Sequence, residues 1–151
     1  MTKYSNAWYV RDELENITWK QETRRTVNYI REEDTKIHSV PHAKQKEHAS
    51  TVVWVANQLI NHLKKKVPEL KGVKLKTEKN SIYVDTDDHT YRPTEMSQTP
   101  EDLYYGIRGS IGDPSDVEKG ELRYYKNLYV DEVQHQVSHL VADVVSKVPR
   151  I

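Results

Sequence analysis

Two long stretches of the chain repeat apolar residues at the spacing of an α-helix. Between positions 52 and 67, and again from 122 to 148, apolar side chains recur three, four or seven residues apart. The two sets are Val52, Val55, Ala56, Leu59, Ile60, Leu63 and Val67, and Leu122, Tyr125, Tyr129, Val133, Val137, Leu140, Val144 and Val148. Pro41 suits a first helical turn, whereas Pro68 and Pro149 end helices. The pattern predicts helices over 41–66 and 122–148.

Between these helices the pattern changes to alternation. Apolar and polar residues alternate over 73–77 and 82–86, and the four residues that separate the two runs include Asn80. Short alternating runs on either side of such a turn are typical of a β-hairpin. The sequence therefore predicts an antiparallel pair of strands here.

The first forty residues carry weaker signals. Val10, Leu14 and Ile17 recur at helical spacing, which predicts a short helix over 5–17 with Ser5 as its cap. Thr, Val and Tyr over 23–30 favour a strand. The charged run within 31–40 predicts an exposed connection.

The segment between the hairpin and the last helix is rich in loop-forming residues. Positions 87–100 are polar and predict an extended loop. Thr99 and Pro100 resemble a capped helix start, which predicts a short helix through Tyr105. Four of the five glycines lie within 106–120, so an irregular segment is expected there.

These elements predict an α+β fold in which two long helices pack on a small antiparallel sheet, the hairpin plus one further strand at 23–30. A chain of 151 residues is the size of one domain with one hydrophobic core. We expect a single domain over 1–151, with 1–40 as an N-terminal extension of a core at 41–148.

Composition predicts that part of the burial comes from neighbouring subunits. Apolar residues make up 36% of the chain, phenylalanine is absent, and ten tyrosines supply most of the aromatic surface. This is a low apolar fraction for a globular domain. A tyrosine ring is apolar but its hydroxyl needs a partner, which suits protein interfaces. We therefore expect a homo-oligomer.

Charge and cysteine content narrow the possible functions. The chain has 23 basic and 23 acidic residues, a balance that argues against a protein devoted to nucleic acid. The absence of cysteine removes disulfides, thiolate nucleophiles and cysteine-based zinc sites. No apolar run reaches the ~20 residues that span a bilayer, and no signal peptide is evident. A soluble protein that is neither secreted nor membrane-bound is expected.

The strongest candidate for metal binding is a run of four residues on the last predicted helix. Asp131, His135, His139 and Asp143 follow one another at intervals of four, and histidine with carboxylates can bind zinc or manganese. On a helical wheel they lie opposite the apolar face at Val133, Val137, Leu140 and Val144. The spacing therefore favours a solvated face or a subunit contact, and we assign no catalytic, cofactor-binding or metal-binding residue.

Two further motifs depart from the patterns they partly match. The acidic run that begins at Asp85 has Thr90 and Met96 where a calcium-binding EF-hand loop needs glycine and glutamate. The glycines at 106, 109 and 112 fit neither dinucleotide-binding nor P-loop spacing. We expect an acidic loop and a flexible connection.

Two further groups to interpret are the basic region from Lys64 to Lys79 and the pair His38 and His42. The basic region has two interpretations. Lysines at the end of a helix favour its dipole and solvation, but they also bind phosphate without reading sequence, so nucleic-acid contact stays open. The two histidines are expected to be exposed near a helix start. A catalytic triad assembled from distant residues also stays open.

The order of elements from 41 to 148 resembles that of phage head–tail joining proteins of the tail-completion or neck class. In that class a long helix precedes a small sheet, an aromatic-glycine segment and a closing helix. Leu103-Tyr104-Tyr105-Gly106 and the helix from Leu122 would occupy the last two positions. Residues 1–40 depart from the class. The resemblance implies a non-enzymatic structural protein that forms a ring in a virion, located in the virion or the host cytoplasm.

Two other functions remain open from the sequence. One is a small oligomeric binding or inhibitor protein, phage-encoded or not. The other is an enzyme that uses histidine and carboxylates, which would need a pocket gathering such residues from separate elements.

Overall fold

The computed structural model describes residues 7–20, 23, 41–78, 80–86, 94–111 and 122–147. In chain order the elements are α1 (Ala7–Leu14), α3 (Pro41–Leu63), the 3₁₀ turn η2 (Pro68–Leu70), β1 (Lys74–Glu78), β2 (Ser81–Asp85), β3 (Thr94–Glu95), α4 (Pro100–Ile111) and α5 (Leu122–Lys147). The fold is α+β, as predicted. Both long helices and the hairpin lie where the apolar patterns place them.

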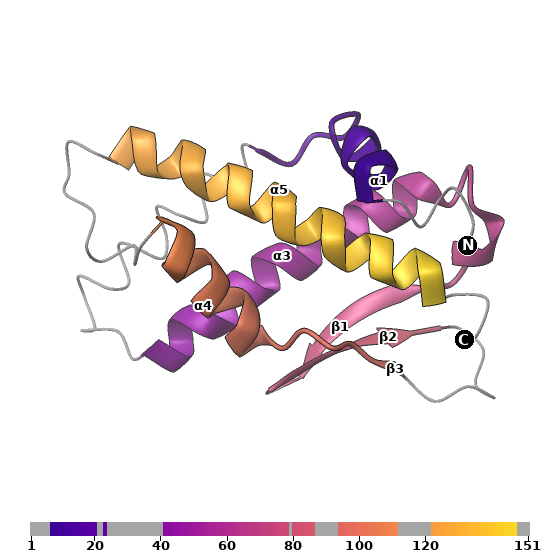
Figure 1. Cartoon of the computed structure of the whole chain (residues 1–151). Coiled ribbons are helices and arrows are strands. Elements are labelled where there is room, and N and C mark those ends of the chain that lie inside the picture. Colours follow the sequence, from indigo (N-terminus) through magenta and orange to yellow (C-terminus); the bar gives the residue numbers. More distant parts are fainter. Residues whose placement is uncertain are drawn as a thin grey trace.

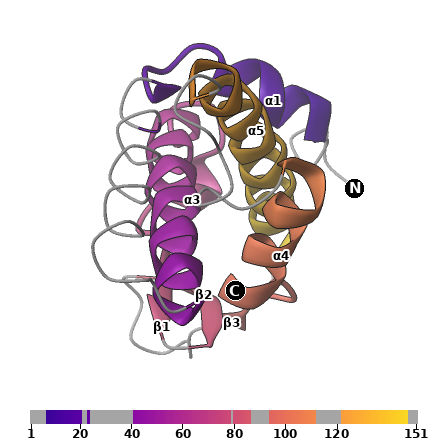
Figure 2. The ribbon, with the colours of Figure 1, turned by 90° about the vertical axis from the view of Figure 1, so that its left-hand side faces the viewer.

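The helices form a layer above the sheet (Figure 1). α5 crosses α3, α1 packs on α5, and α4 fills the angle between the first half of α3 and α5. Figure 2 shows α3 on one side of this layer, with α4 and α5 on the other. β1 is the strand that packs against α3.

The sheet is antiparallel in the order β1-β2-β3. Leu75 pairs with Val84 and Tyr83 with Glu95. Leu75, Ile82 and Val84 are buried, whereas their neighbours along each strand are exposed or half-buried. One face therefore packs on the helices and the other carries polar side chains.

The third strand of the described sheet is not the one predicted over 23–30, of which the structure describes only the first residue. Thr23, the first residue of the strand predicted over 23–30, is helical: its N–H and its hydroxyl both donate to the carbonyl of Trp19, at 3.1 Å each. Residues 24–30 lie outside the described ranges. The third strand is instead β3, within the segment predicted as a loop, and Met96 N–H extends it by donating to Ile82 C=O at 2.7 Å. A two-residue strand is too short to leave an alternating pattern.

Helix α4 is longer than predicted because glycine serves helix packing there. It continues past Tyr105 through Gly106 and Gly109 to Ile111. A Cβ atom at position 106 would lie 3.1 Å from Nε2 of Gln136 on α5. The glycine thus permits a close approach of two helices rather than an irregular backbone.

Gly106→Ala is expected to lower the free energy of unfolding by about 1 kcal/mol, although alanine alone favours a helix over glycine by about that amount. The new methyl group must displace the Gln136 amide, which is hydrogen-bonded at both ends. Urea denaturation should show the opposite sign in a Gln136→Ala background, where the same substitution stabilises. Stabilisation in both backgrounds would contradict this account.

The described residues form one continuous hydrophobic core despite the low apolar fraction. It runs from Val10 and Leu14 on α1 through both long helices to Ile82 and Val84 on the sheet. Tyr104 and Tyr129 are buried within the chain itself. The chain's own side chains therefore fill the interior of the described part. An argument that the protein forms oligomers has to rest on its surface residues. None of the helices in the described ranges is both long enough and apolar enough to cross a bilayer.

Candidate protein-binding surface

A cleft opens between the first half of α3, the hairpin and the start of α4. Its volume is about 450 Å³. The lining residues are Gln45, Lys46 and Ala49 from α3, Thr77 and Asn80 from the hairpin, and Pro100 and Glu101 from α4. We call it the α3–hairpin cleft.

Asn57 joins α3 to β1 further along the helix than the residues that line this cleft. Its Nδ2 donates to Leu75 C=O at 2.9 Å, and its Oδ1 accepts from Leu75 N–H at 2.8 Å. This clasp fastens α3 to the edge of the sheet. Nearer the hairpin turn the facing helix residue is Ala49, whose small side chain leaves the cleft open.

A capping box fixes the α4 wall of the cleft. Thr99 N–H donates to Oδ2 of Asp102 at 3.0 Å, and Asp102 N–H donates to the Thr99 hydroxyl at 3.1 Å. These reciprocal bonds satisfy main-chain groups at the helix start. The capped start predicted from the sequence is confirmed, and it places Pro100 and Glu101 in the cleft wall.

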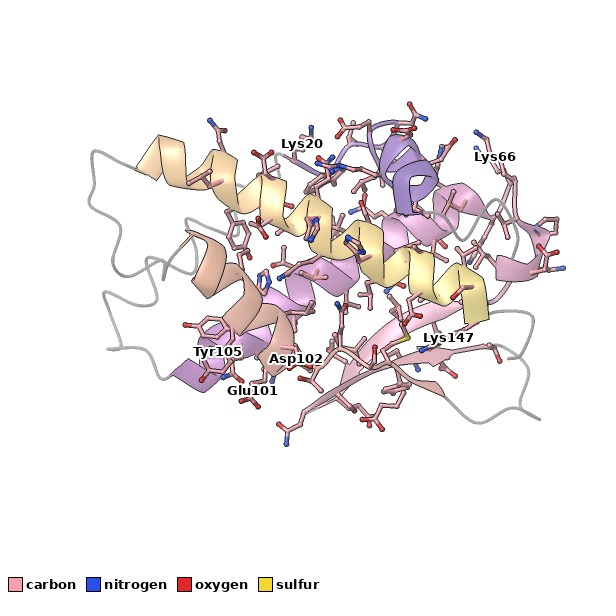
Figure 3. All side chains as sticks on the ribbon, in the orientation of Figure 1. Lys20, Lys66, Glu101, Asp102, Tyr105 and Lys147 are labelled. Carbon is pink, nitrogen blue, oxygen red and sulfur yellow. The ribbon has the colours of Figure 1, made fainter. Side chains whose placement is uncertain are left out.

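Two exposed aromatic side chains lie on the two helices that line this cleft. Trp54 is 43% exposed and Tyr105 is 49% exposed, and they are the exposed large hydrophobic residues in the described part of the chain. Tyr105 follows Glu101 by four residues, about 6 Å along the same side of α4, and Figure 3 shows the two together. Trp54 follows Lys46 by eight residues, about 12 Å along α3. Exposed aromatic residues beside a cleft are typical of protein interfaces.

A second cleft, of about 480 Å³, lies where α1, α4 and α5 meet. It is lined by Arg11, Gln98, Asp102, Leu103, Gly106, Asp131, Glu132, His135 and Gln136. Within the described ranges, no three histidine or acidic side chains converge as they would to hold a metal ion.

The four residues spaced along the last helix do not form one group. Asp131, His135 and His139 are exposed and Asp143 is half-buried, as the helical wheel predicts. The rings of His135 and His139 lie edge to face with centroids 4.5 Å apart. Asp143 instead pairs with Lys147 at 3.2 Å. Two of the four therefore touch, and Asp131 and His135 line the second cleft.

A buried hydrogen-bonded network joins α3, α4 and α5 at His48. The Nδ1 atom of His48 lies 2.8 Å from the Tyr129 hydroxyl, and its Nε2 lies 2.7 Å from Oε1 of Gln136. The Gln136 Nε2 donates to Leu103 C=O at 2.9 Å. This last bond fixes the amide orientation, so Oε1 must accept from a protonated Nε2 of His48. His48 is thus the neutral Nε2–H tautomer, and Tyr129 donates to Nδ1.

Burial explains the titration of this network. It lowers the pKa of His48 to about 4, against the raising effect of the hydrogen bonds that His48 makes with Gln136 and Leu103, and it raises the pKa of Tyr129. Both side chains bond inside the protein, and neither lines the two clefts. The sequence did hold a signal for His48, since it precedes Val52 and Val55 by four and seven residues and so shares their face.

The basic region is divided between two parts of the surface. Lys64, Lys65 and Lys66 follow α3, whereas Lys74 and Lys76 lie on the exposed face of β1. Lys66 donates to Oε1 of Glu13 at 2.6 Å, and Lys76 lies 2.9 Å from Asp85. Lys79 lies outside the described residues. At least two of these lysines are thus bound to carboxylates.

Glu13 anchors α1 to the end of α3. Its second carboxylate oxygen lies 2.7 Å from Nε2 of His62. The hydrogen bond from Lys66 holds the pKa of the Glu13 carboxyl below its usual value, although burial acts in the opposite direction.

The remaining candidates lie partly outside the described ranges. His38, the side chain of His42, the acidic positions 87 and 88 and Gly112 are among the residues not described. Gly106 and Gly109 are helical, so the expected flexible connection is wrong for residues 106–111. Comparison with protein-family models, curated proteins and solved structures finds no match for this chain.

Proposed function

We propose that the protein is a non-enzymatic structural component that assembles with neighbouring subunits through the α3–hairpin cleft and the exposed aromatic residues on its two helices. The observation that carries the proposal is the position of Trp54 and Tyr105. Both leave large aromatic surface in water, and both lie on the two helices that form the cleft. Aromatic side chains of this kind supply much of the binding energy in protein interfaces.

The positions of the titratable groups also support a structural function. His48 and Tyr129 have their functional atoms directed at each other inside the core. His135 and His139 face outward on α5. The described residues that could donate or accept protons are thus used in packing or spread over the surface.

The class that this proposal favours is the ring-forming head–tail joining protein of phages. The supporting features are the long helix α3, the hairpin, the Tyr104-Tyr105-Gly106 segment on α4 and the closing helix α5, in that order. In this class Tyr105 would contact the next subunit of a ring, in the virion or during its assembly in the host cytoplasm. A small oligomeric binding protein would use the same surface, and a stable dimer in place of a ring would favour it.

Tyr105→Ser and Trp54→Ser test the proposal by sedimentation velocity over a range of concentrations. The natural chain should form species heavier than a monomer, and each substitution should weaken association by about tenfold or more, since buried aromatic residues at interfaces contribute this much. Asn61→Ser, at an exposed position further along α3, is the matched control and should leave the masses unchanged. A natural chain that stays monomeric at every concentration would refute the proposal.

A further inference from the structure

His135 and His139 lie one turn apart on the exposed side of α5. Both side chains are exposed, and their rings touch edge to face with the ring centres 4.5 Å apart. Two histidines four residues apart share one side of a helix and can hold the same metal ion. The sequence shows this spacing, whereas the distance between the rings comes from the structure.

The distance between the two rings agrees with a chelate. An ion bound at about 2.1 Å by one nitrogen of each ring lies about 3.2 Å from each ring centre. Two ring centres 4.5 Å apart then make an angle of about 90° at the ion. Neighbouring ligands in square-planar and octahedral complexes make this right angle, whereas a tetrahedral ion needs a wider one.

Rotation of the rings converts their present contact into this arrangement. The Cβ–Cγ bond of a histidine points at the centre of its ring, so turning the ring about that bond moves the nitrogens and leaves the centre in place. This torsion has a broad range in histidine. Because both side chains are exposed, each ring can turn without a movement of α5.

We infer that His135 and His139 bind one divalent transition-metal ion that prefers tetragonal geometry, Cu²⁺ or Ni²⁺, through one nitrogen of each ring. Neutral imidazole suits these ions, and Cu²⁺ has the highest affinity among the divalent first-row metals. Two adjacent positions in the plane of the ion stay open for water or for oxygen and nitrogen donors of another molecule. His135 also lines the second cleft, so the ion lies at the edge of that cleft.

The neighbouring carboxylates leave the two histidines as the protein ligands. Asp143, one turn after His139, pairs with Lys147 at 3.2 Å. Asp131 lies one turn before His135, but no three histidine or acidic side chains of the described residues are arranged to hold an ion together. None of the described residues that line the α3–hairpin cleft belongs to α5. Metal binding here therefore goes beyond the proposed assembly function and does not depend on it.

Titration calorimetry of the full chain with NiCl₂ at about pH 8 tests the site. The natural chain should bind one Ni²⁺ through this pair. His135→Gln and His139→Gln should each weaken that binding about tenfold or more, because each removes one arm of the chelate. His38→Gln, in the other histidine pair spaced by four residues, is the matched control and should leave this binding unchanged.

Stability provides a second readout of the same site. One ion reaches both rings only while α5 is folded, so Ni²⁺ at about 100 times its Kd should raise the melting temperature of the natural chain but not that of His139→Gln. Electron paramagnetic resonance of the Cu²⁺ complex should show coupling to two imidazole nitrogens in the natural chain and to fewer in His139→Gln.

The outcomes separate this site from the proposed function. Equal Ni²⁺ binding by the natural chain and His139→Gln, a loss as large in His38→Gln, or no binding of either ion by the natural chain would each overturn the chelate. Self-association measured without metal should be the same in His139→Gln as in the natural chain, so failure of the metal site leaves the assembly surface untouched.

Discussion

Between pH 6.5 and pH 4 the free energy of unfolding is expected to fall by about 3 kcal/mol through the protonation of His48 alone. Burial lowers the pKa of this histidine from 6.5 to about 4 in the folded protein. Below pH 6.5 His48 binds a proton in the unfolded chain but not in the folded chain. Its contribution to the free energy of unfolding is therefore complete above pH 6.5 and is lost as the pH falls to 4. Urea denaturation at a series of pH values measures it.

His48→Gln is the control for this pH dependence. Glutamine does not titrate, yet its amide can still donate to Gln136. The variant should be less stable at pH 7, and its stability should change little between pH 6.5 and pH 4.5. The carboxyls of Glu13 and Asp85 have pKa values lowered by hydrogen bonds from Lys66 and Lys76, so they weaken the fold only below that window. A natural chain with no slope in this window would contradict the buried neutral tautomer.

The sequence predicted the elements that carry a clear apolar periodicity of their own, because such a pattern indicates the type of element without contacts to other elements. The apolar face of α3, with Leu59 at its centre, and the alternation around Ile82 needed no knowledge of the rest of the fold. β3 could not be predicted in this way, because its two residues are held by pairing with β2 and by the bond of Met96 to Ile82. Thr23 is a β-branched residue in a helical turn, where local hydrogen bonds override its propensity.

The length of α4 was predicted wrongly for a related reason, which concerns Gly106. Backbone freedom at Gly106 is a local property, whereas the contact that requires a missing side chain is made with Gln136, thirty residues away in sequence. A single sequence carries no sign of such a contact.

The sequence could identify the exposed aromatic residues of the candidate surface, but it could not give the shape of the cleft. Tyr105 belongs to the aromatic-glycine segment that the sequence singles out, and Trp54 falls outside the apolar positions of its helix. The cleft depends on how α3 packs against the hairpin and α4, to which the bonds of Asn57 with Leu75 contribute. Such packing between elements is not encoded in the periodicity of any one of them.

The network at His48 shows how the fold positions this surface. Leu103 lies on α4 between the capped start of the helix and Tyr105, and its carbonyl accepts from Gln136 on α5. Gln136 in turn holds His48 on α3. The two helices that carry the exposed aromatic residues are thus fixed to each other through α5. Buried polar bonds of this kind specify one arrangement of the helices, because any shift leaves a donor or acceptor unpaired.

Gln136→Leu is therefore expected to lower the free energy of unfolding by about 2–3 kcal/mol, since the buried His48 Nε2–H loses its partner at about 1–3 kcal/mol. Leu103 C=O loses the bond from Gln136 as well, but it lies within α4 and keeps its place in the helical bonding pattern. Gln134→Leu is the matched control: both glutamines are 8% exposed on the same helix, but Gln134 lies outside the network, so its replacement should cost about 1 kcal/mol or less. Equal losses in the two variants would contradict the importance of the network.

A second substitution separates unpaired groups from lost packing. In the Gln136→Leu background, His48→Leu removes the stranded donor, so it should cost about 1–3 kcal/mol less than His48→Leu alone. Such coupling requires that His48 and Gln136 act on each other directly, as their 2.7 Å contact implies. Losses that simply add would mean that each side chain contributes through its volume. Since α4 is fixed to α5 through the same amide, Gln136→Leu should also weaken self-association when Tyr105 is intact, whereas Gln134→Leu should not.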